Sequence, residues 1–468
     1  MDFSPYFLPV AVAAILVAMI LLFTSLLTIL MKMSDETTGD ELADVKNTLR
    51  RGRIALVLSF TLAGVLFLAV KYIPGSGLEG HIQDWLNLII RWAHVILGIS
   101  WIGASFYFIF LENSLNRTEN LRDELAGNLW AVHGGGFYYV EKYKVSPKEL
   151  PKKLHWFKYE AYYTWLTGIL LLSVVYYMNA KSFMVDPSVR DISAGMAVLI
   201  GIGTIVSGWF VYDVLCRTPL LHKKQAFAFV GFGIVVLYSI FLTQYLSGRA
   251  AFIHIGALLG TVMAGNVFFV IIPSQKELVA AAKEGRPVNP ELGKLAGLRS
   301  LHNNYITLPV IFIMISNHFP ATFGHTANWA ILAGLTLASV AVRHYLNLHE
   351  KGQLAVRMIP FAAVAIFALI VVTAPKATVK NTTPISFAEV EPIFKDRCTV
   401  CHSSHPTDDV QKIAPGGVMF DTKEQIQKMA PRILVRAVQT ATMPQGNKTK
   451  ITDDEREKIG RWIEQGAK

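Results

Sequence analysis

The stretch Cys398-Thr-Val-Cys-His402 decides the fold of the C-terminal part of this chain. Two thiols separated by two residues and followed directly by histidine are the attachment signal of a c-type haem. The thiols form thioethers with the haem vinyl groups, and the histidine ligates iron. Met443 lies downstream in a loop that Pro444 stiffens, and it is the predicted sixth ligand; Met429 and Met419 are weaker candidates. The sequence therefore predicts one covalent haem c in a tail that carries electrons.

Two helices are predicted to frame this motif, as in small class I cytochromes c. Residues 386–397 (SFAEVEPIFKDR) have helical apolar spacing, and Thr452 followed by Asp-Asp-Glu starts a last helix with a capping residue and acidic side chains in its first turn. The alternative is a zinc site, but the chain has three cysteines and no second Cys pair to complete one. The third thiol, Cys216, is expected to be a reduced cytosolic thiol.

The rest of the chain has the composition of a membrane protein. Of its 468 residues, 52% are hydrophobic and 17% are charged, and mostly apolar runs of about 18 or more residues recur, which excludes an ordinary soluble enzyme. About ten spans are predicted, at residues 8–31, 54–71, 87–110, 160–178, 192–212, 226–246, 250–272, 303–318, 327–346 and 357–373. The expected fold is all-α: a transmembrane bundle of about 8–10 helices over residues 1–373, a linker at 374–384 and a cytochrome c domain at 385–468.

The distribution of lysine and arginine predicts the orientation of the bundle. Loops at about 32–53, 113–158, 213–225, 274–301 and 347–356 hold about twenty of these residues and the alternate loops about three, so the positive-inside rule makes the first set cytoplasmic. Both termini then lie outside, with the tail in the periplasm of a bacterial inner membrane. The net charge of +10 largely reflects this bias; it indicates anionic lipid in the bilayer and gives no support for nucleic-acid binding.

Three histidines, His94, His254 and His318, are predicted near the periplasmic ends of their helices. Ionisable groups inside a bilayer are costly, so they are functional candidates. Two of these imidazoles on different helices are predicted to ligate a haem b, of which the bundle would hold one or two, and Arg91 and Arg249 to meet its propionates. The alternative is that they are buried neutral groups bonded between helices, or a proton path.

A second polar group is predicted at the cytoplasmic end. His302, Asn303 and Asn304 open one span, and Arg343 and His344 end the next at the same depth. Amides, an imidazole and a guanidinium make an anion or substrate site there, although capping and bonds between helices explain part of the pattern equally well. His302 and His318 are about 24 Å apart if they lie on one helix, which suits a transverse electron path.

The long loop before the fourth span is the third unusual region. Residues 130–139 (WAVHGGGFYY) join three glycines to aromatic rings, and residues 152–165 add lysines and further aromatics. Glycine permits close backbone approach and aromatic rings stack, so the loop suits a planar anion. Ordinary anchoring at the membrane interface explains the same composition.

Three strings resemble the bacterial membrane-bound urate hydroxylase family: HVILGISWIGASFYF (94–108), GGGFYYVEKYKVSPKELPKKLHWFKYEAYYTWLTG (134–168) and HNNYITLPVIFIMISNH (302–318), followed by the cytochrome c tail. The similarity spans nearly the whole chain. The resemblance implies an oxidoreductase that converts urate to 5-hydroxyisourate in purine breakdown and passes electrons to cytochrome c without making peroxide. An external cytochrome c or a terminal oxidase is then the expected acceptor.

The hypothesis that follows has urate entering from the cytoplasm, between the 133–160 loop and the group around residues 302–307 and 343–344. His302 or Glu160 is the expected base, because the urate dianion gives up electrons more readily than the monoanion. The electrons leave through a bundle haem to the tail haem, and water adds at C5. Two rivals remain: a quinol-oxidising cytochrome b/c module, and a purine transporter with a redox-sensing cytochrome. The oligomeric state is open.

Overall fold

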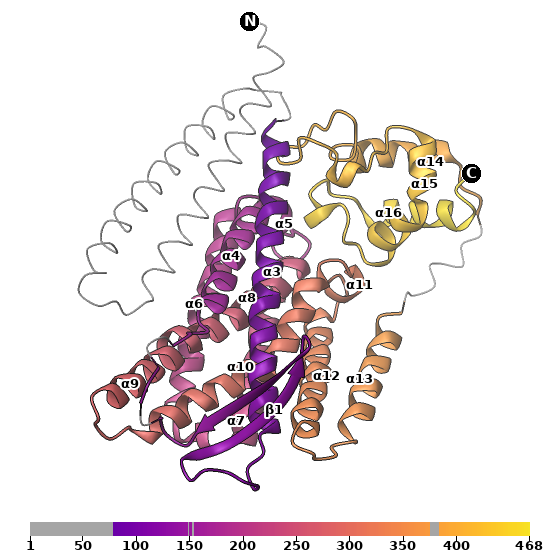
Figure 1. Ribbon diagram of the computed structural model, residues 1–468. Helices are drawn as coiled ribbons and strands as arrows, with labels where there is room; N and C mark the ends of the chain where they lie inside the picture. Colours follow the sequence, from indigo (N-terminus) through magenta and orange to yellow (C-terminus); the bar gives the residue numbers. More distant parts are fainter. Residues whose placement is uncertain (1–77, 148, 152–153, 375–382) are drawn as a thin grey trace, which may run out of the picture.

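The structure, a computed structural model, describes residues 78–468 apart from residue 148, residues 152–153 and residues 375–382 (Figure 1). The spans predicted at 8–31 and 54–71, and most of the predicted linker, lie outside the described residues. In the described part, a bundle of long helices is followed by a lobe of short helices at residues 383–468. A β-hairpin lies at the end of the bundle away from this lobe (Figure 1).

Each span predicted within the described residues corresponds to helical structure. The bundle consists of α3 Leu78–Ser114, α4 Tyr159–Leu172 with η1 Ser173–Tyr177, α5 Ala180–Phe183, α6 Ala194–Cys216, η2 Pro219–His222, α7 Lys224–Thr243, α8 Gly248–Gly265 with η3 Asn266–Ile271 and α9 Ile272–Lys283, α10 Pro290–Ser316, α11 Pro320–Phe323, α12 Asn328–His349 and α13 Met358–Val372.

Five helical segments of the described part are long and apolar enough to cross a membrane. They are Gln83–Ser114, Ala194–Cys216, Lys224–Thr243, Gly248–Lys283 and Asn328–His349. The predicted spans at 160–178 and 303–318 are helical, as α4 with η1 and as α10, but do not meet this combined standard of length and apolarity, and α13 is shorter. The fold is thus mostly helical and consistent with a membrane protein.

Helix α8 is the central helix of the bundle. In the most apolar part of the segment Gly248–Lys283, 61% of the residues are buried. The corresponding parts of α6 and α12 have 28% and 33% of their residues buried. The hydroxyl of Ser247 accepts from the backbone N–H of Ala250 at 3.2 Å and so caps the start of the helix. Phe252, Ile255 and Leu258 of α8 belong to the main apolar core, so burial of this helix fixes its neighbours α4, α6, α7 and α10 around it.

The hairpin corrects the expectation of an entirely helical fold. Strand β1 Leu125–His133 pairs antiparallel with β2 Gly136–Tyr143. Gly134 and Gly135 form the two-residue turn with φ of 58° and 82°, and a turn with positive φ at both positions matches the right-handed twist of paired strands. Of the glycines expected to line an anion site, Gly134 and Gly135 therefore form the exposed tip of a hairpin.

The C-terminal lobe has an apolar core of its own. Its helices are α14 Phe387–Ile393 with η4 Phe394–Cys398, η5 Pro415–Gly417, α15 Lys423–Ile433 with η6 Leu434–Gln439, η7 Gln445–Asn447 and α16 Asp453–Glu464. The core gathers Val390, Phe394, Ile426, Ile459 and Trp462 from three of these helices. The helices predicted over 386–397 and after Thr452 are confirmed, and α14, α15 and α16 each begin with a capping box.

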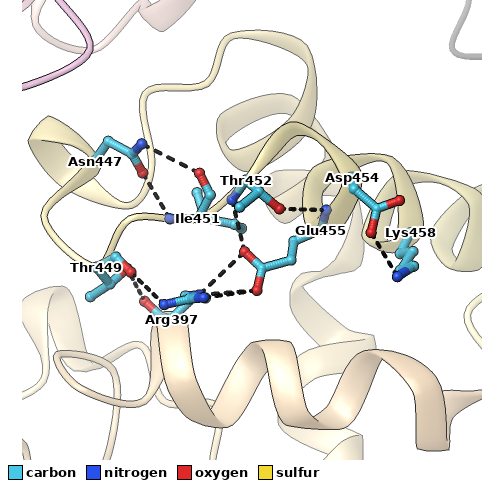
Figure 2. A network of polar contacts seen from close by, with 8 residues as sticks. All are labelled: Arg397, Asn447, Thr449, Ile451, Thr452, Asp454, Glu455 and Lys458. Carbon is cyan, nitrogen blue, oxygen red and sulfur yellow. Dashed lines mark hydrogen bonds and ion pairs between the residues drawn. The ribbon is translucent and has the colours of Figure 1, made fainter.

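A polar network connects the start of α16 to Arg397, the residue just before Cys398 (Figure 2). The guanidinium of Arg397 pairs with the Glu455 carboxylate at 3.0 Å and donates to the Thr449 carbonyl at 2.8 Å. The Glu455 carboxylate also accepts from the backbone N–H of Thr452 at 2.7 Å. Burial on its own raises the pKa of Glu455, but Arg397 and Thr452 outweigh it and hold that pKa below its usual range.

We predict that Glu455→Gln weakens the lobe by about 1–2 kcal/mol, because it removes an ion pair and weakens a helix cap. A carboxyl group with a lowered folded-state pKa stabilises the fold above its ordinary pKa of about 4.3, and this contribution is lost as the pH falls through the lowered value. Hydrogen–deuterium exchange of residues 385–468 in the full-length protein should show faster exchange in the variant at neutral pH, and a smaller difference near pH 4.

Asp454→Asn is the matched control. Asp454 begins the same helix but pairs only with Lys458, and its side chain is 70% exposed, so its loss should change the exchange little. Equal effects of the two substitutions would show that the Arg397–Glu455 pair does not hold the lobe together.

Candidate functional site

The C-terminal lobe contains a pocket that brings together the residues predicted to hold haem c. Cys398, Cys401, His402, Met429 and Met443 all line it. Nδ1 of His402 donates to the Val418 carbonyl oxygen at 2.9 Å, which leaves Nε2 as the nitrogen with a free lone pair. Burial lowers the pKa of His402, so the imidazole is neutral at neutral pH, as a metal ligand must be.

Met443 reaches this pocket from a loop whose backbone is held on both sides. Its N–H donates to the Arg436 carbonyl at 2.9 Å, and its own carbonyl accepts from Arg456 at 2.6 Å. The side chain itself contributes only to the pocket wall. Two thiols, an oriented imidazole and a thioether around one pocket fit the requirements of a covalently attached haem.

The same pocket is a poor zinc site. In residues 78–468, leaving out the three gaps, no group of three or more His, Cys, Asp or Glu side chains is arranged to hold a metal ion. This geometry disfavours the zinc alternative.

At the end of the bundle that faces the lobe, two predicted arginines lie in a polar cluster. Nε of Arg249 donates to the Asn317 side-chain oxygen at 3.3 Å, which also accepts from the Tyr176 hydroxyl at 2.9 Å. Arg91 bonds Asn87 one turn away, at 2.8 Å. No carboxylate in the described part of the chain pairs with Arg91 or Arg249. Burial, followed by the charges of Arg432 and Arg249, lowers the pKa of Arg436 in the lobe.

The structure does not join the three predicted periplasmic histidines into one cluster. Nδ1 of His94 lies 3.1 Å from both the Thr164 carbonyl and the Thr167 hydroxyl. His254 is fully buried, with Nδ1 at 2.8 Å from the Ala250 carbonyl. His318 is exposed in the turn after α10. Among the described residues, no contact links these rings; Nδ1 of His94 and Nδ1 of His254 each have a hydrogen-bond partner on a helix.

His254 gives a mixed result for the predicted haem b. Its Nε2 is buried without a hydrogen-bond partner in the described structure, as a metal ligand without metal would be. However, helix α6 lies directly against that nitrogen, because a Cβ added at Gly201 would be 2.4 Å from Nε2. A porphyrin does not fit between these helices in this arrangement. The residues therefore do not fit a haem at His254 as the helices are packed.

At the opposite end of the bundle, His302 belongs to a network between α6, η3 and α10. Nδ1 of His302 bonds the Tyr212 hydroxyl at 2.8 Å, and Tyr212 accepts from the Asn266 amide at 2.9 Å. Asn266 also donates to the Asn303 side chain at 2.9 Å. Phe227 stacks on the His302 ring at 4.6 Å between centroids. This imidazole is held rigidly from two sides.

A second network joins α10 to α12 and contains three of the predicted residues. The side-chain oxygen of Asn304 accepts from Nε of Arg343 and from the Asn347 amide, both at 2.9 Å. Tyr305 bonds Nδ1 of His344 at 2.7 Å. Asn304, Arg343 and Asn347 are 0%, 2% and 5% exposed. The hydrogen bond between Arg343 and Asn304 shows that α10 and α12 contact each other at these residues.

This second network leaves several polar atoms unsatisfied. Among the described residues, Nη2 of Arg343, Nδ2 of Asn304 and Oδ1 of Asn347 are buried and have no hydrogen-bond partner. No described carboxylate pairs with Arg343, whose guanidinium lies 4.0 Å over the Phe106 ring. Glu160, near the start of α4, also has one carboxylate oxygen that is buried without a hydrogen-bond partner among the described residues. Buried donors, an acceptor and a cation without a directly paired carboxylate together suit a polar, anionic partner.

Sequence reasoning missed the partners that shape both networks. Asn347 lies one helical turn beyond Arg343, on the same face of α12, and this spacing was the available signal. Asn266 and Tyr212 gave no signal because their partners are distant in the chain. Asp213 pairs with the buried Arg299 at 2.8 Å, and its side chain is 13% exposed.

We predict that Asp213→Ala lowers the stability of the bundle by about 3–5 kcal/mol, because it leaves the Arg299 charge buried without its carboxylate. The double variant Asp213→Ala with Arg299→Met should recover much of this loss. Thermal unfolding of the purified protein in detergent measures both effects. Additive losses in the double variant would show that the two side chains are not coupled.

Comparison with known proteins agrees with this picture in one respect. A family model described as urate oxidase N-terminal matches residues 80–374, from the first described helix to the end of the bundle. Searches of curated proteins and of solved structures each found no match. The match covers more than half of the chain and stops before the C-terminal lobe. The chain therefore belongs to the urate oxidase N-terminal family.

Proposed function

We propose that this chain is a membrane-bound oxidoreductase that converts urate to 5-hydroxyisourate and passes the electrons to a c-type haem in its C-terminal lobe. The family indicates a urate-related activity. The observation that carries the proposal is Arg343, a guanidinium that is 2% exposed, with no carboxylate partner among the described residues. The carboxylate of Glu350 acts on this charge without forming an ion pair, so a buried cation of this kind gains from a bound anion that pairs with it directly.

Urate matches the unsatisfied atoms of this site. It is a flat anion at neutral pH, with carbonyl oxygens and N–H groups around its edge. Nη2 of Arg343 and Nδ2 of Asn304 would donate to its oxygens, and Oδ1 of Asn347 would accept from an N–H. Phe106, which lies against the guanidinium, adds an aromatic wall. The chemistry that these groups supply is binding and orientation of a planar anion.

The reaction adds water and removes two electrons and two protons from urate. Water adds at C5, and the urate ring loses its electrons without forming peroxide. The proposed base is Glu160 or His302. Glu160 has one carboxylate oxygen buried without a partner, whereas Nδ1 of His302 is already bonded to Tyr212, which favours Glu160. His344, which bonds Tyr305, is proposed to hold the part of α12 that carries Arg343 in place.

The acceptor is proposed to be one haem c, attached at Cys398 and Cys401 and ligated by His402 and Met443. When bound, such a haem accepts one electron at a time and can pass it to an external cytochrome c or a terminal oxidase. The pocket and the orientation of His402 support this assignment. A bundle haem b near His94, His254 and His318 stays a prediction, and no step is assigned to it here because helix α6 covers His254.

The proposed location is the bacterial inner membrane, with the lobe in the periplasm. Five apolar helices support membrane insertion. The lysine- and arginine-rich loops support the orientation, and the hairpin and the lobe lie at opposite ends of the bundle (Figure 1).

The first prediction from this proposal concerns the tail. Purified protein should show covalent haem c, and anaerobic urate should reduce it, whereas Cys398→Ala with Cys401→Ala should lack covalent haem but still bind urate. A pyridine haemochrome assay and urate binding by calorimetry measure the two properties separately. Reduction by quinol and not by urate would support the rival electron-transfer module, and uptake into proteoliposomes without reduction would support the rival transporter.

The second prediction concerns the site. Arg343→Leu should weaken urate binding by about 2 kcal/mol or more, which is about 30-fold, because it removes the buried cation that pairs with the anion. The variant should keep its thermal stability without urate, since a buried unpaired charge is removed, and should lose the stabilisation that urate gives the wild type.

Arg286→Leu serves as the control for charge. Arg286 is an exposed arginine that pairs with Glu277 and Glu284 in a loop between α9 and α10, and its loss should leave urate binding unchanged. Undiminished binding by Arg343→Leu would contradict the proposed site.

A further inference from the structure

The loop that carries Met443 lies between the core of the C-terminal lobe and the end of the bundle. On one side it meets Gly324, which follows α11. A Cβ added at Gly324 would be 2.5 Å from Cγ2 of Thr442 and 2.9 Å from the Thr440 carbonyl oxygen. Both distances are shorter than real carbon contacts allow, so the bundle touches the loop directly at this point. The contact ends one residue before Met443.

The other side of the loop touches the bundle in the same way. A Cβ added at Gly446 would be 2.4 Å from the Val185 carbonyl oxygen, after α5, and Gly446 has a positive φ of 59°. Only glycine fits this position without strain and without a clash. At the rim, Lys181 pairs with Asp409 at 3.4 Å, and the same carboxylate side chain pairs with Lys448. The bundle therefore contacts the chain on both flanks of Met443.

Within the lobe, the hydrogen bonds that hold Met443 are made by its backbone, and its side chain packs against the lobe core. Its N–H and carbonyl bond Arg436 and Arg456, and these bonds do not fix where the loop lies relative to the bundle. A thioether is a weak iron ligand, so small displacements of its loop decide whether the sulfur reaches the metal. The close contacts at Gly324 and Gly446 limit such displacements.

We infer that the membrane-embedded part is a positioning element for the sixth haem ligand: Gly324 and Gly446 seat the Met443 loop against the bundle and keep its sulfur in the pocket. This inference rests on the proposed haem c. The redox properties of the C-terminal lobe would then depend on its contact with the bundle. A lobe that lost the contacts at Gly324 and Gly446 would be a weaker electron acceptor.

The test is Gly324→Ala in the full-length protein. Gly324 has a negative φ of −84°, so alanine fits its backbone and acts through the added methyl group. The expected result is partial loss of the long-wavelength absorption band of Met-ligated ferric haem, with a lower midpoint potential, because methionine ligation raises the potential. Covalent haem content, measured by pyridine haemochrome, should be unchanged.

Two companion variants separate the docking contact from local effects. The added methyl group would also lie 2.8 Å from the Pro320 carbonyl in its own turn. Thr442→Ser removes Cγ2 and keeps the hydroxyl that bonds the Arg436 carbonyl. Gly324→Ala with Thr442→Ser should therefore regain part of the lost band and potential. Gly233→Ala, in α7, is the matched control, because nothing lies within 4 Å of its added methyl group.

If Gly324→Ala does not accumulate as folded protein, Lys181→Glu replaces it. The Lys181 side chain is 68% exposed, so the fold tolerates the change, while a like charge opposite Asp409 pushes the rim apart. A full absorption band and an unchanged potential in the folded variants would overturn the inference while leaving the proposed function intact. Absence of covalent haem from the wild type would overturn both.

Discussion

A buried guanidinium without a carboxylate is the constraint around which the candidate site is built. Taking the Arg343 charge out of water costs several kcal/mol unless the protein supplies partners. Asn304 and Phe106 supply part of what is needed, through a hydrogen bond to Nε and a ring face under the cation. The remaining donor, Nη2, is left without a partner among the described residues. A site that is incomplete by one flat anion is what an enzyme acting on urate requires, because the substrate then completes the network.

Helix α10 connects this site to the other end of the molecule. Asn304 lies in the network with Arg343, and Asn317, just beyond the end of the helix, bonds Tyr176 and Arg249 beside the C-terminal lobe. The two asparagines are separated by about 20 Å of helix. Substrate binding and the proposed electron exit therefore lie at opposite ends of one rigid element, packed against the central helix α8. Gly324, which contacts the Met443 loop, follows the short helix α11, the next helix after α10.

Apolar runs and helix-capping residues, which are local features of the sequence, were enough to predict the long helices of the bundle and the first and last helices of the C-terminal lobe. Apolar runs located the spans, and Thr452 with Glu455 located the start of the last helix, because these signals depend on neighbours in the chain. The hairpin was missed because its signal is the turn at Gly134 and Gly135, in a segment where aromatic residues are equally typical of a membrane interface.

The site was predicted in part, for a related physical reason. Arg343 and Asn304 were chosen because polar groups in an apolar helix are costly, and the structure pairs them. Their partners could not be predicted, since contacts such as Asn266 with Asn303 depend on how distant helices pack. The structure does not bring the predicted periplasmic histidines together: His254 faces Gly201, and His318 lies exposed in the turn after α10, which hydropathy does not reveal.

The most direct measurement is a cryo-electron microscopy map of the protein purified with urate under anaerobic conditions. The account predicts a planar ligand within hydrogen-bond distance of Arg343 and Asn304, at the end of the bundle away from the lobe. A map in which a protein carboxylate pairs with Arg343, with urate bound elsewhere or absent at saturating concentration, would contradict it.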